Sequence, residues 1–188
     1  MLTEHSKTGS RFGAGINACG GLDDRAFVRG QWSVECRDQN GNLKWKEDFH
    51  NIVTNEGLNE LLNQTLAAQT QITSWYVGLK NTGSEAATDV MNSHSGWTEN
   101  TTYSESTRQA WTANGAASSQ SVTNSSSKAT FSINGSTTIY GAFLTSNSTK
   151  GGTTGKLYAV GDFATSRAVI SGDSLLVTAT FTTADDGV

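Results

Sequence analysis

One stretch of this sequence, Thr54–Leu66, has the apolar spacing that an α-helix requires, and this lone helix limits the fold classes open to the chain. The other apolar residues fall in short runs separated by clusters of Gly, Asn and Ser, a pattern typical of short strands joined by tight turns. Helices do not alternate with these strands, as a parallel sheet would require. We therefore expect an all-β fold: an antiparallel, jelly-roll-like β-sandwich with one short α-helix and an extended N-terminal arm.

The composition agrees with this fold class. Ser, Thr and Asn together make up 62 of the 188 residues, and there are 20 Gly and no Pro. Thr and the aromatic residues suit pleated strands, whereas Gly, Asn and Ser suit turns. A hydrophobic content of 35% with five Trp is too high for a disordered chain. The length suits one β-sandwich domain, which we assign to residues 26–188.

Residues 1–25 are expected to form the arm, because they carry five Gly and show neither strand nor helix periodicity. Gly13–Ala18 matches a permissive dinucleotide-binding pattern, but no strand precedes it and no helix follows, so we expect no nucleotide cofactor. The arm mixes apolar and guanidinium side chains with Gly, which suits folding on a partner. Its expected contact residues are Arg11, Phe12, Ile16 and Arg25. The alternative is a terminal segment without a role.

The clearest local signal is a β-hairpin near the start of the domain. Apolar alternation in Trp32–Cys36 and Leu43–Lys46 flanks the pair Asn40-Gly41. An Asn-Gly pair favours a type I′ turn, which needs positive φ at two residues. We therefore expect these two strands to pair antiparallel.

The helix should begin after Thr54, whose hydroxyl is a favourable N-cap. Gly57 weakens a helix by about 1 kcal/mol relative to Ala, so packing on a sheet must hold it in place. Four leucines at helical spacing are expected to provide this packing: Leu58, Leu61, Leu62 and Leu66.

The strands expected after the helix are short. They are Ile72–Leu79, Trp97–Thr98, Arg108–Thr112, Ser121–Val122, Ala129–Ile133, Thr138–Leu144, Lys156–Ala164 and Ser174–Thr182. The last alternates most clearly, with Leu175, Val177, Ala179 and Phe181 on one face. The expected core joins the helix to strands carrying Trp75, Val77, Phe143, Leu144, Leu175 and Val177.

Charge and hydropathy exclude several kinds of partner. Only 16% of the residues are charged and the net charge is −4, so a basic footprint for nucleic acid or an anionic membrane is absent. No apolar run approaches the ~18 residues that a bilayer span needs, and the first residues lack the apolar stretch of a signal peptide. We expect a soluble protein made in the cytoplasm.

No constellation in the sequence predicts catalysis. The three His lie in separate segments, and Cys19 and Cys36 cannot form a zinc site alone; they are expected to be free thiols, although they could pair. Asp48 and His50 share a strand face without a nucleophile nearby, so we interpret them as a solvated edge. Four scattered acids, Glu99, Glu105, Asp162 and Asp173, are interpreted as loop and surface acids rather than a catalytic pair. We expect no catalytic residues, no metal and no cofactor.

The aromatic residues fall into two groups. Trp32, Trp45 and Trp75 occupy expected strands and should pack in the core. Trp97, Tyr103 and Trp111 lie in polar surroundings and are the candidates for an exposed contact surface, for protein or for sugar.

An ordered series of short blocks from Phe49 to Thr182 resembles a family of tailed-bacteriophage virion proteins, over about 134 of the 188 residues. The blocks are HNIVTNEGLNELL at His50–Leu62, TSWYVGLKN at Thr73–Asn81, HSGWTENTTYSESTRQAW at His94–Trp111, FSINGSTTIYGAFLTS at Phe131–Ser146, and LYAVGDFATSRAVISGDSLLVTATF at Leu157–Phe181.

The resemblance implies a capsid decoration, or cement, protein of jelly-roll type. Such a protein is made in the bacterial host cytoplasm, coats the outside of an icosahedral head, and has the major capsid protein and its own copies, as a dimer or trimer, as partners. The family has no catalytic residues to carry over. Two alternatives remain open: a carbohydrate- or receptor-binding module of a phage tail or fibre, in which Trp97, Tyr103 and Trp111 would stack on sugars, and a cell-wall glycan hydrolase, which would need an acid pair.

Overall fold

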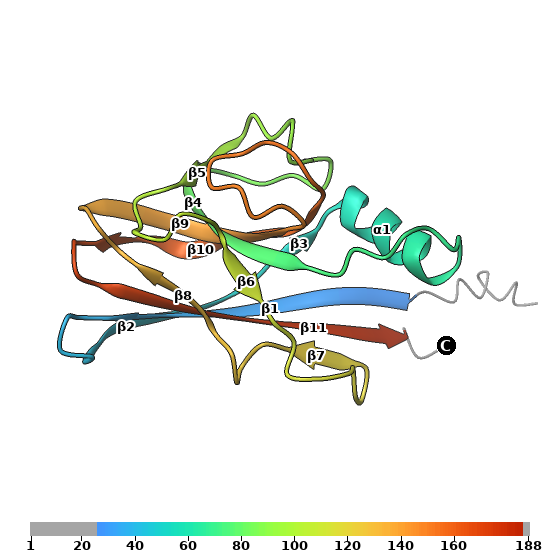
Figure 1. Cartoon of the computed structure of the whole chain (residues 1–188), viewed down its shortest axis with the longest axis horizontal. Coiled ribbons are helices and arrows are strands. Elements are labelled where there is room, and N and C mark those ends of the chain that lie inside the picture. The colour runs from blue at the N-terminus through green and yellow to red at the C-terminus, as the bar shows by residue number, and fades with distance from the viewer. Residues whose placement is uncertain (1–25, 186–188) are drawn as a thin grey trace, which may run out of the picture.

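A computed structural model describes residues 26–185 as two antiparallel β-sheets packed face to face, with one helix at one end (Figure 1). The first sheet contains β1 (Ala26–Arg37), β2 (Leu43–His50), β7 (Ser121–Thr123), β8 (Ala129–Ser132) and β11 (Ser174–Asp185). The second contains β3 (Ile52–Val53), β4 (Trp75–Gly83), β5 (Trp97–Asn100), β6 (Gln109–Trp111), β9 (Thr137–Thr145) and β10 (Leu157–Val169). The expected all-β sandwich with one helix, α1 (Asn55–Thr65), is confirmed.

The first sheet is organised around the pairing of β1 with β11. The two strands are in register from Ala26↔Asp185 to Arg37↔Ser174. β2 adds to the free edge of β1, while β7 and β8 add to different parts of β11. The alternation expected for β11 is confirmed, because Leu175, Val177, Ala179 and Phe181 are all buried.

The second sheet has the order β3-β10-β9-β4-β5, with β6 also on β4. The long strands differ from their expected bounds mainly at their ends. β4 begins at Trp75 rather than Ile72, and β10 continues to Val169. The register of β10 against β9 shifts between Asp162 and Arg167. This irregularity breaks the apolar alternation, so the sequence pattern does not predict where β10 ends.

The β1–β2 hairpin is confirmed, but its turn is not of type I′. Among the turn residues only Gly41 has positive φ, +83°, and its N–H donates to the Asp38 carbonyl at 2.9 Å. This is the three-residue hairpin loop, in which one Gly in the left-handed region follows an ordinary turn. The Asp38 carboxylate accepts the N–H groups of Asn40 and Asn42, both at 2.9 Å, which favours this loop over the two-residue turn.

Helix α1 begins as expected, with Thr54 as its N-cap accepting the Gly57 N–H at 3.0 Å. The expectation that its leucines hold it on a sheet is wrong for Leu58, Leu62 and Leu66, which are exposed, while Leu61 is half-buried. The buried residues of α1 are Gly57 and Glu60. A Cβ at position 57 would lie 2.3 Å from the Tyr158 carbonyl oxygen, so the missing side chain lets the helix lie directly on β10.

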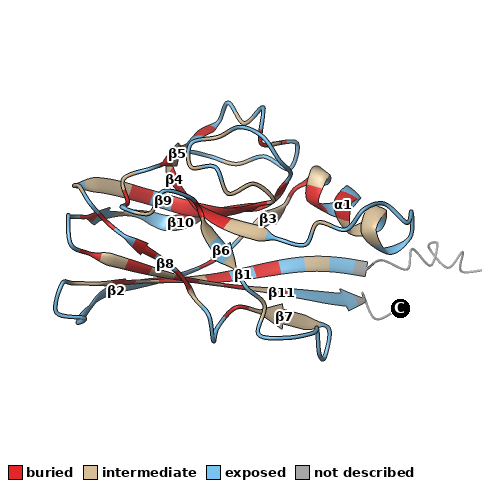
Figure 2. Ribbon diagram, viewed as in Figure 1, coloured by how far each residue is buried: buried red, intermediate tan, exposed pale blue. Residues whose placement is uncertain are grey.

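Buried residues are concentrated on the strands of the two packed sheets (Figure 2). The core that they form is rich in aromatic rings. Trp32, fully buried as expected, stacks on Phe49 with ring centroids 5.9 Å apart and meets the edge of Phe181 at 6.2 Å. Trp45 and Trp75 are half-buried and pack against this cluster. Of the other expected core residues, Val77, Phe143, Leu144, Leu175 and Val177 are all buried. Cys36 is a buried free thiol, whereas Cys19 lies outside the described residues.

Three of the four acids expected at the surface are in structural ion pairs, which corrects that interpretation: Glu99, Asp173 and, as described below, Asp162. Arg108 and Glu99 are almost fully buried and form a bidentate pair, with Nε–Oε1 and Nη2–Oε2 distances of 3.0 and 2.7 Å. Asp173 is buried and pairs with Lys44 at 2.6 Å. The sequence does not predict the Glu99 and Asp173 pairs, because the tertiary structure determines which cation lies beside each of these two acids. Asp48 and His50 are exposed, as expected for a solvated edge.

Replacing Arg108 by Met should therefore destabilise the protein strongly. It leaves the Glu99 carboxylate buried without its counter-charge and removes donors to the carbonyls of Asn147 and Gly152. Breaking a buried pair in this way costs about 3–5 kcal/mol. Lys46→Met is the control, because Lys46 and Asp48 form an exposed pair worth at most about 1 kcal/mol. Urea unfolding of both variants measures the difference, and equal losses would contradict the structural role of Arg108.

Candidate docking face around helix α1

The residues singled out in the sequence are not brought together as expected. Arg11, Phe12, Ile16 and Arg25 lie outside the described residues. Trp97 and Tyr103 are 2% and 0% exposed, so the prediction that they form a contact surface is wrong. Trp111 is half-buried.

Tertiary packing explains why Trp97 and Tyr103 are buried despite polar neighbours. Trp97 lies 5.0 Å from the ring of Phe143 and donates its indole N–H to Asp89 at 2.9 Å. Tyr103 meets the edge of Phe131 at 4.9 Å. The adjacent residues Thr98 and Ser104 are exposed, while the aromatic side chain next to each turns into the core.

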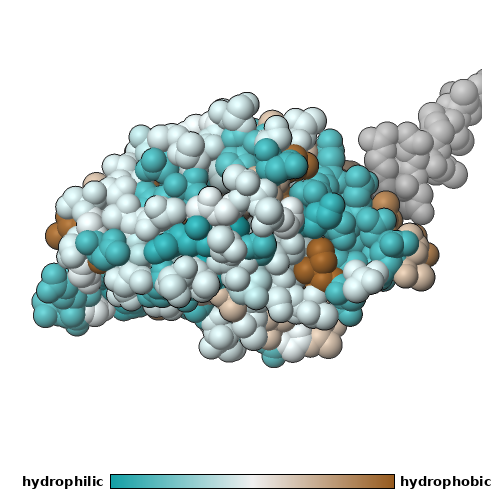
Figure 3. Space-filling view, turned by 45° about the horizontal axis from the view of Figure 1, so that its top comes forward, coloured by the Kyte–Doolittle hydropathy of each residue, from teal (hydrophilic) through white to brown (hydrophobic). Residues whose placement is uncertain are grey.

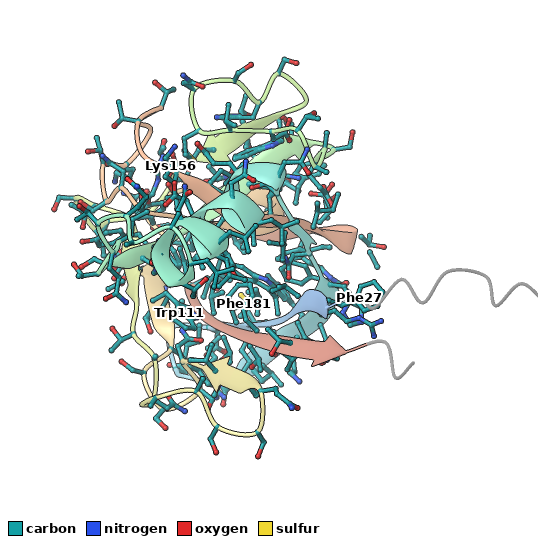
Figure 4. The ribbon with its side chains drawn as sticks, turned by 90° about the vertical axis from the view of Figure 1, so that its right-hand side faces the viewer. Phe27, Trp111, Lys156 and Phe181 are labelled. Atoms are coloured by element: carbon teal, nitrogen blue, oxygen red, sulfur yellow. The ribbon has the colours of Figure 1, made fainter. Side chains whose placement is uncertain are left out.

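A cavity of about 180 Å³ lies between α1 and the end of the sandwich that the helix covers (Figure 4). Its walls are mostly apolar and come from α1 and from both sheets: Glu60, Leu61, Gln64, Trp75, Trp111, Val122, Leu144, Tyr158 and Phe181. We call this space the α1 cavity.

The aromatic rings of the α1 cavity are fixed by strand pairing and by contact with one another. Trp75 and Trp111 are opposite one another in the pairing of β4 with β6. Tyr158 meets the edges of Trp75 and Phe181, each at 5.3 Å. The Trp111 indole donates to the Ala179 carbonyl at 3.1 Å, which connects the two sheets. The cavity wall is therefore a preorganised apolar surface.

Glu60 gives the α1 cavity an acidic wall. Its side chain is about nine-tenths buried, and the cation paired with it in the described part of the chain is Lys156, whose Nζ is 3.7 Å from Oε1. Lys156 lies closer to Glu56, at 3.1 Å, and this hydrogen bond raises the pKa of Lys156. Helix α1 itself contains no Lys or Arg. Glu60 is therefore a weakly compensated carboxylate beside an apolar space.

Three leucines lie four residues apart along the outer side of α1 and its C-cap, and we call them the leucine ridge: Leu58, Leu62 and Leu66, 39%, 53% and 80% exposed. Residues four apart lie on one side of a helix, and this side is roughly opposite Gly57 and Glu60. Apolar side chains are visible among hydrophilic ones at the end of the molecule where α1 lies (Figure 3). Adjoining apolar residues left exposed in this way mark an interaction surface. The leucine ridge and the α1 cavity together form the candidate docking face.

A second cluster of charges connects β4 to β10. Lys80 is fully buried, lies 3.0 Å from Glu85 and also pairs with Asp162. Gly141 on β9 is opposite both Lys80 and Asp162 in the strand pairings, so the two side chains meet across a residue without one. Burial, with a hydrogen bond to Glu85, raises the pKa of Asp162 to about 6. The two carboxylates share one lysine, which is typical of a structural network.

Comparisons with known proteins identify no family for this chain, so the docking face is the feature from which we propose a function. The chain matches no family model and no curated protein. The described residues contain no cluster of three or more His, Cys, Asp or Glu that could hold a metal ion. The one described helix, with 11 residues, is too short to cross a membrane.

The raised pKa of Asp162 predicts a pH-dependent stability. A carboxyl that binds its proton more tightly in the folded state costs stability when it ionises, so the cost is absent below the ordinary value of 3.8 and complete above about 6. Between pH 4 and pH 7, the wild-type chain should lose up to about 3 kcal/mol of unfolding free energy relative to Asp162→Asn. Urea titrations at stepped pH measure this difference.

Asp48→Asn is the control for that measurement. A hydrogen bond from Lys46 lowers the pKa of Asp48, so its charged form is favoured by folding and is lost only as the pH falls through the acid range. The stability difference between this variant and the wild type should change little over the same window. A flat difference for Asp162→Asn as well would contradict the raised pKa.

Proposed function

We propose that the chain is a non-enzymatic virion structural protein that binds the outer surface of an icosahedral phage head and cements neighbouring major capsid subunits. The observation that carries the proposal is the leucine ridge on α1. The sandwich holds α1 in place through the close contact of Gly57 with the Tyr158 carbonyl and through Glu56, which accepts the Leu157 N–H at 2.7 Å, so the ridge leucines are not needed for that contact. They are available to a partner.

The size of the ridge fits attachment by several copies at once. Fully burying a leucine side chain contributes about 1.5–3 kcal/mol, so three partly exposed leucines supply only part of a stable contact. Linking two or three copies raises the apparent affinity without new contacts. This supports a dimer or trimer on the capsid surface rather than an isolated subunit.

The resemblance to phage decoration proteins is spread over the fold. The blocks at His50–Leu62 and Leu157–Phe181 include most of α1 and the strand β10 on which it lies. The weakly charged surface, rich in Ser, Thr and Asn, suits repeated self-association on a particle. Both features support the proposed role.

The alternative, a carbohydrate- or receptor-binding module of a tail or fibre, has one observation in its favour. The α1 cavity combines Trp75, Trp111 and Tyr158 with the polar groups of Glu60 and Gln64. Against it, Trp97 and Tyr103 are buried, and the rings around the cavity meet edge to face. Sugar stacking needs an open aromatic face, so this role ranks second.

Leu62→Glu should weaken attachment to capsids by about tenfold or more, as loss of a central apolar anchor does, without lowering the melting temperature. Ile170→Glu is the matched control, because Ile170 and Leu62 are both 53% exposed and Ile170 lies outside the docking face. Heads assembled without this chain are mixed with each variant, and the bound copies are counted after sedimentation. Equal binding by all variants would contradict a role for the ridge, and failure of the wild type to bind would contradict the capsid role.

The purified chain should release no sugar from peptidoglycan or capsular polysaccharide. The acid pair to test for catalysis is Glu85 with Asp162, which both contact Lys80. Glu99 is not tested, because it forms a buried ion pair with Arg108. Reducing-sugar release by the wild type that disappears in both Glu85→Gln and Asp162→Asn would show a glycan hydrolase instead.

A further inference from the structure

We propose that the α1 cavity is the binding site for residues 10–16 of the same chain, with the phenyl ring of Phe12 inside the cavity and the guanidinium of Arg11 on Glu60. The contact belongs to the isolated protein and does not depend on the proposed attachment to capsids. It makes the N-terminal segment a structural part of the docking face, beneath α1, while the leucine ridge faces outward.

The α1 cavity has the size and chemistry of a site for an aromatic side chain. A cavity of about 150 Å³ lined by apolar side chains is large enough to hold benzene. The α1 cavity, at about 180 Å³, exceeds this, and its walls include Trp75, Trp111, Tyr158 and Phe181. A phenyl ring placed there meets ring edges and faces on several sides.

The N-terminal segment starts from the right place and is long enough. The described chain begins at Ala26, the first residue of β1, at the end of the sandwich where α1 lies (Figure 4). Phe12 is 14 residues before Ala26, a reach of up to about 46 Å at ~3.3 Å per residue. A tether of this length holds the segment at an effective concentration in the millimolar range, which favours the chain's own cavity over that of a second copy.

Charge and side-chain size single out Arg11-Phe12 within residues 1–25. Glu60 on the cavity wall is nine-tenths buried, with Lys156 at 3.7 Å, and a guanidinium can pair with such a carboxylate at two points. Small residues, Ser10 and Gly13–Gly15, flank the pair and let the backbone approach α1 closely. By contrast, Leu22 is followed by Asp23 and Asp24, which would be repelled by Glu60.

Disulfide trapping in the full-length protein tests the contact. Ala14→Cys is combined with Gln64→Cys, whose position lines the cavity, in a background with Cys19→Ser and Cys36→Ala. The control combines Ala14→Cys with Asn42→Cys, which lies in the exposed β1–β2 turn. At micromolar concentration we expect rapid oxidation to a cross-linked monomer for position 64 and at least about tenfold slower cross-linking for position 42.

Three further variants test the anchors. Phe12→Ala and Arg11→Glu should each slow the position-64 cross-link by about tenfold or more, whereas Arg11→Lys should slow it less. Without introduced cysteines, Phe12→Ala should also shift the tryptophan emission to longer wavelength, because water then reaches Trp75 and Trp111. Equal rates at positions 64 and 42, or no effect of Phe12→Ala, would overturn the proposal. Cross-linked dimers as the main product would assign the site to a second copy and overturn the intrachain contact.

Discussion

The pairing of β1 with β11 is the interaction on which the rest of the sandwich depends. It connects the two ends of the described chain, and even its closest partners in sequence, Arg37 and Ser174, are 137 positions apart. All the other strands of the first sheet attach to one of these two. Closing so long a loop is entropically costly, and the buried alternation of both strands, including Trp32 and Val177, offsets it.

One close backbone contact then determines what the surface offers to a partner. Gly57 lets α1 lie on the Tyr158 carbonyl, and this contact fixes the rotation of the helix about its own axis. The same rotation directs Glu60, Leu61 and Gln64 toward the α1 cavity and leaves Leu58, Leu62 and Leu66 outside. An apolar helix face that the fold does not use suits attachment better than chemistry, which is why we favour an assembly role.

Buried and partly buried charged groups outside the docking face stabilise the fold. Arg108 with Glu99, Lys44 with Asp173, and Lys80 with Glu85 and Asp162 each connect segments that are separate in the fold. These pairs use seven of the 30 charged residues of the chain to hold loops and strands together.

Alternation and turn chemistry are local, and they determined what the sequence could predict: the all-β class, the β1–β2 hairpin, the N-cap at Thr54 and the buried face of β11. The type of the hairpin turn was missed because the Asp38 side chain competes for its N–H groups. The burial of Trp97, Tyr103 and Glu99, and the outward direction of the leucine ridge, were decided by the tertiary structure alone. Each depends on a partner far away in the chain, such as Phe143, Phe131, Arg108 or the Tyr158 carbonyl, and no local pattern records which distant residue will be there.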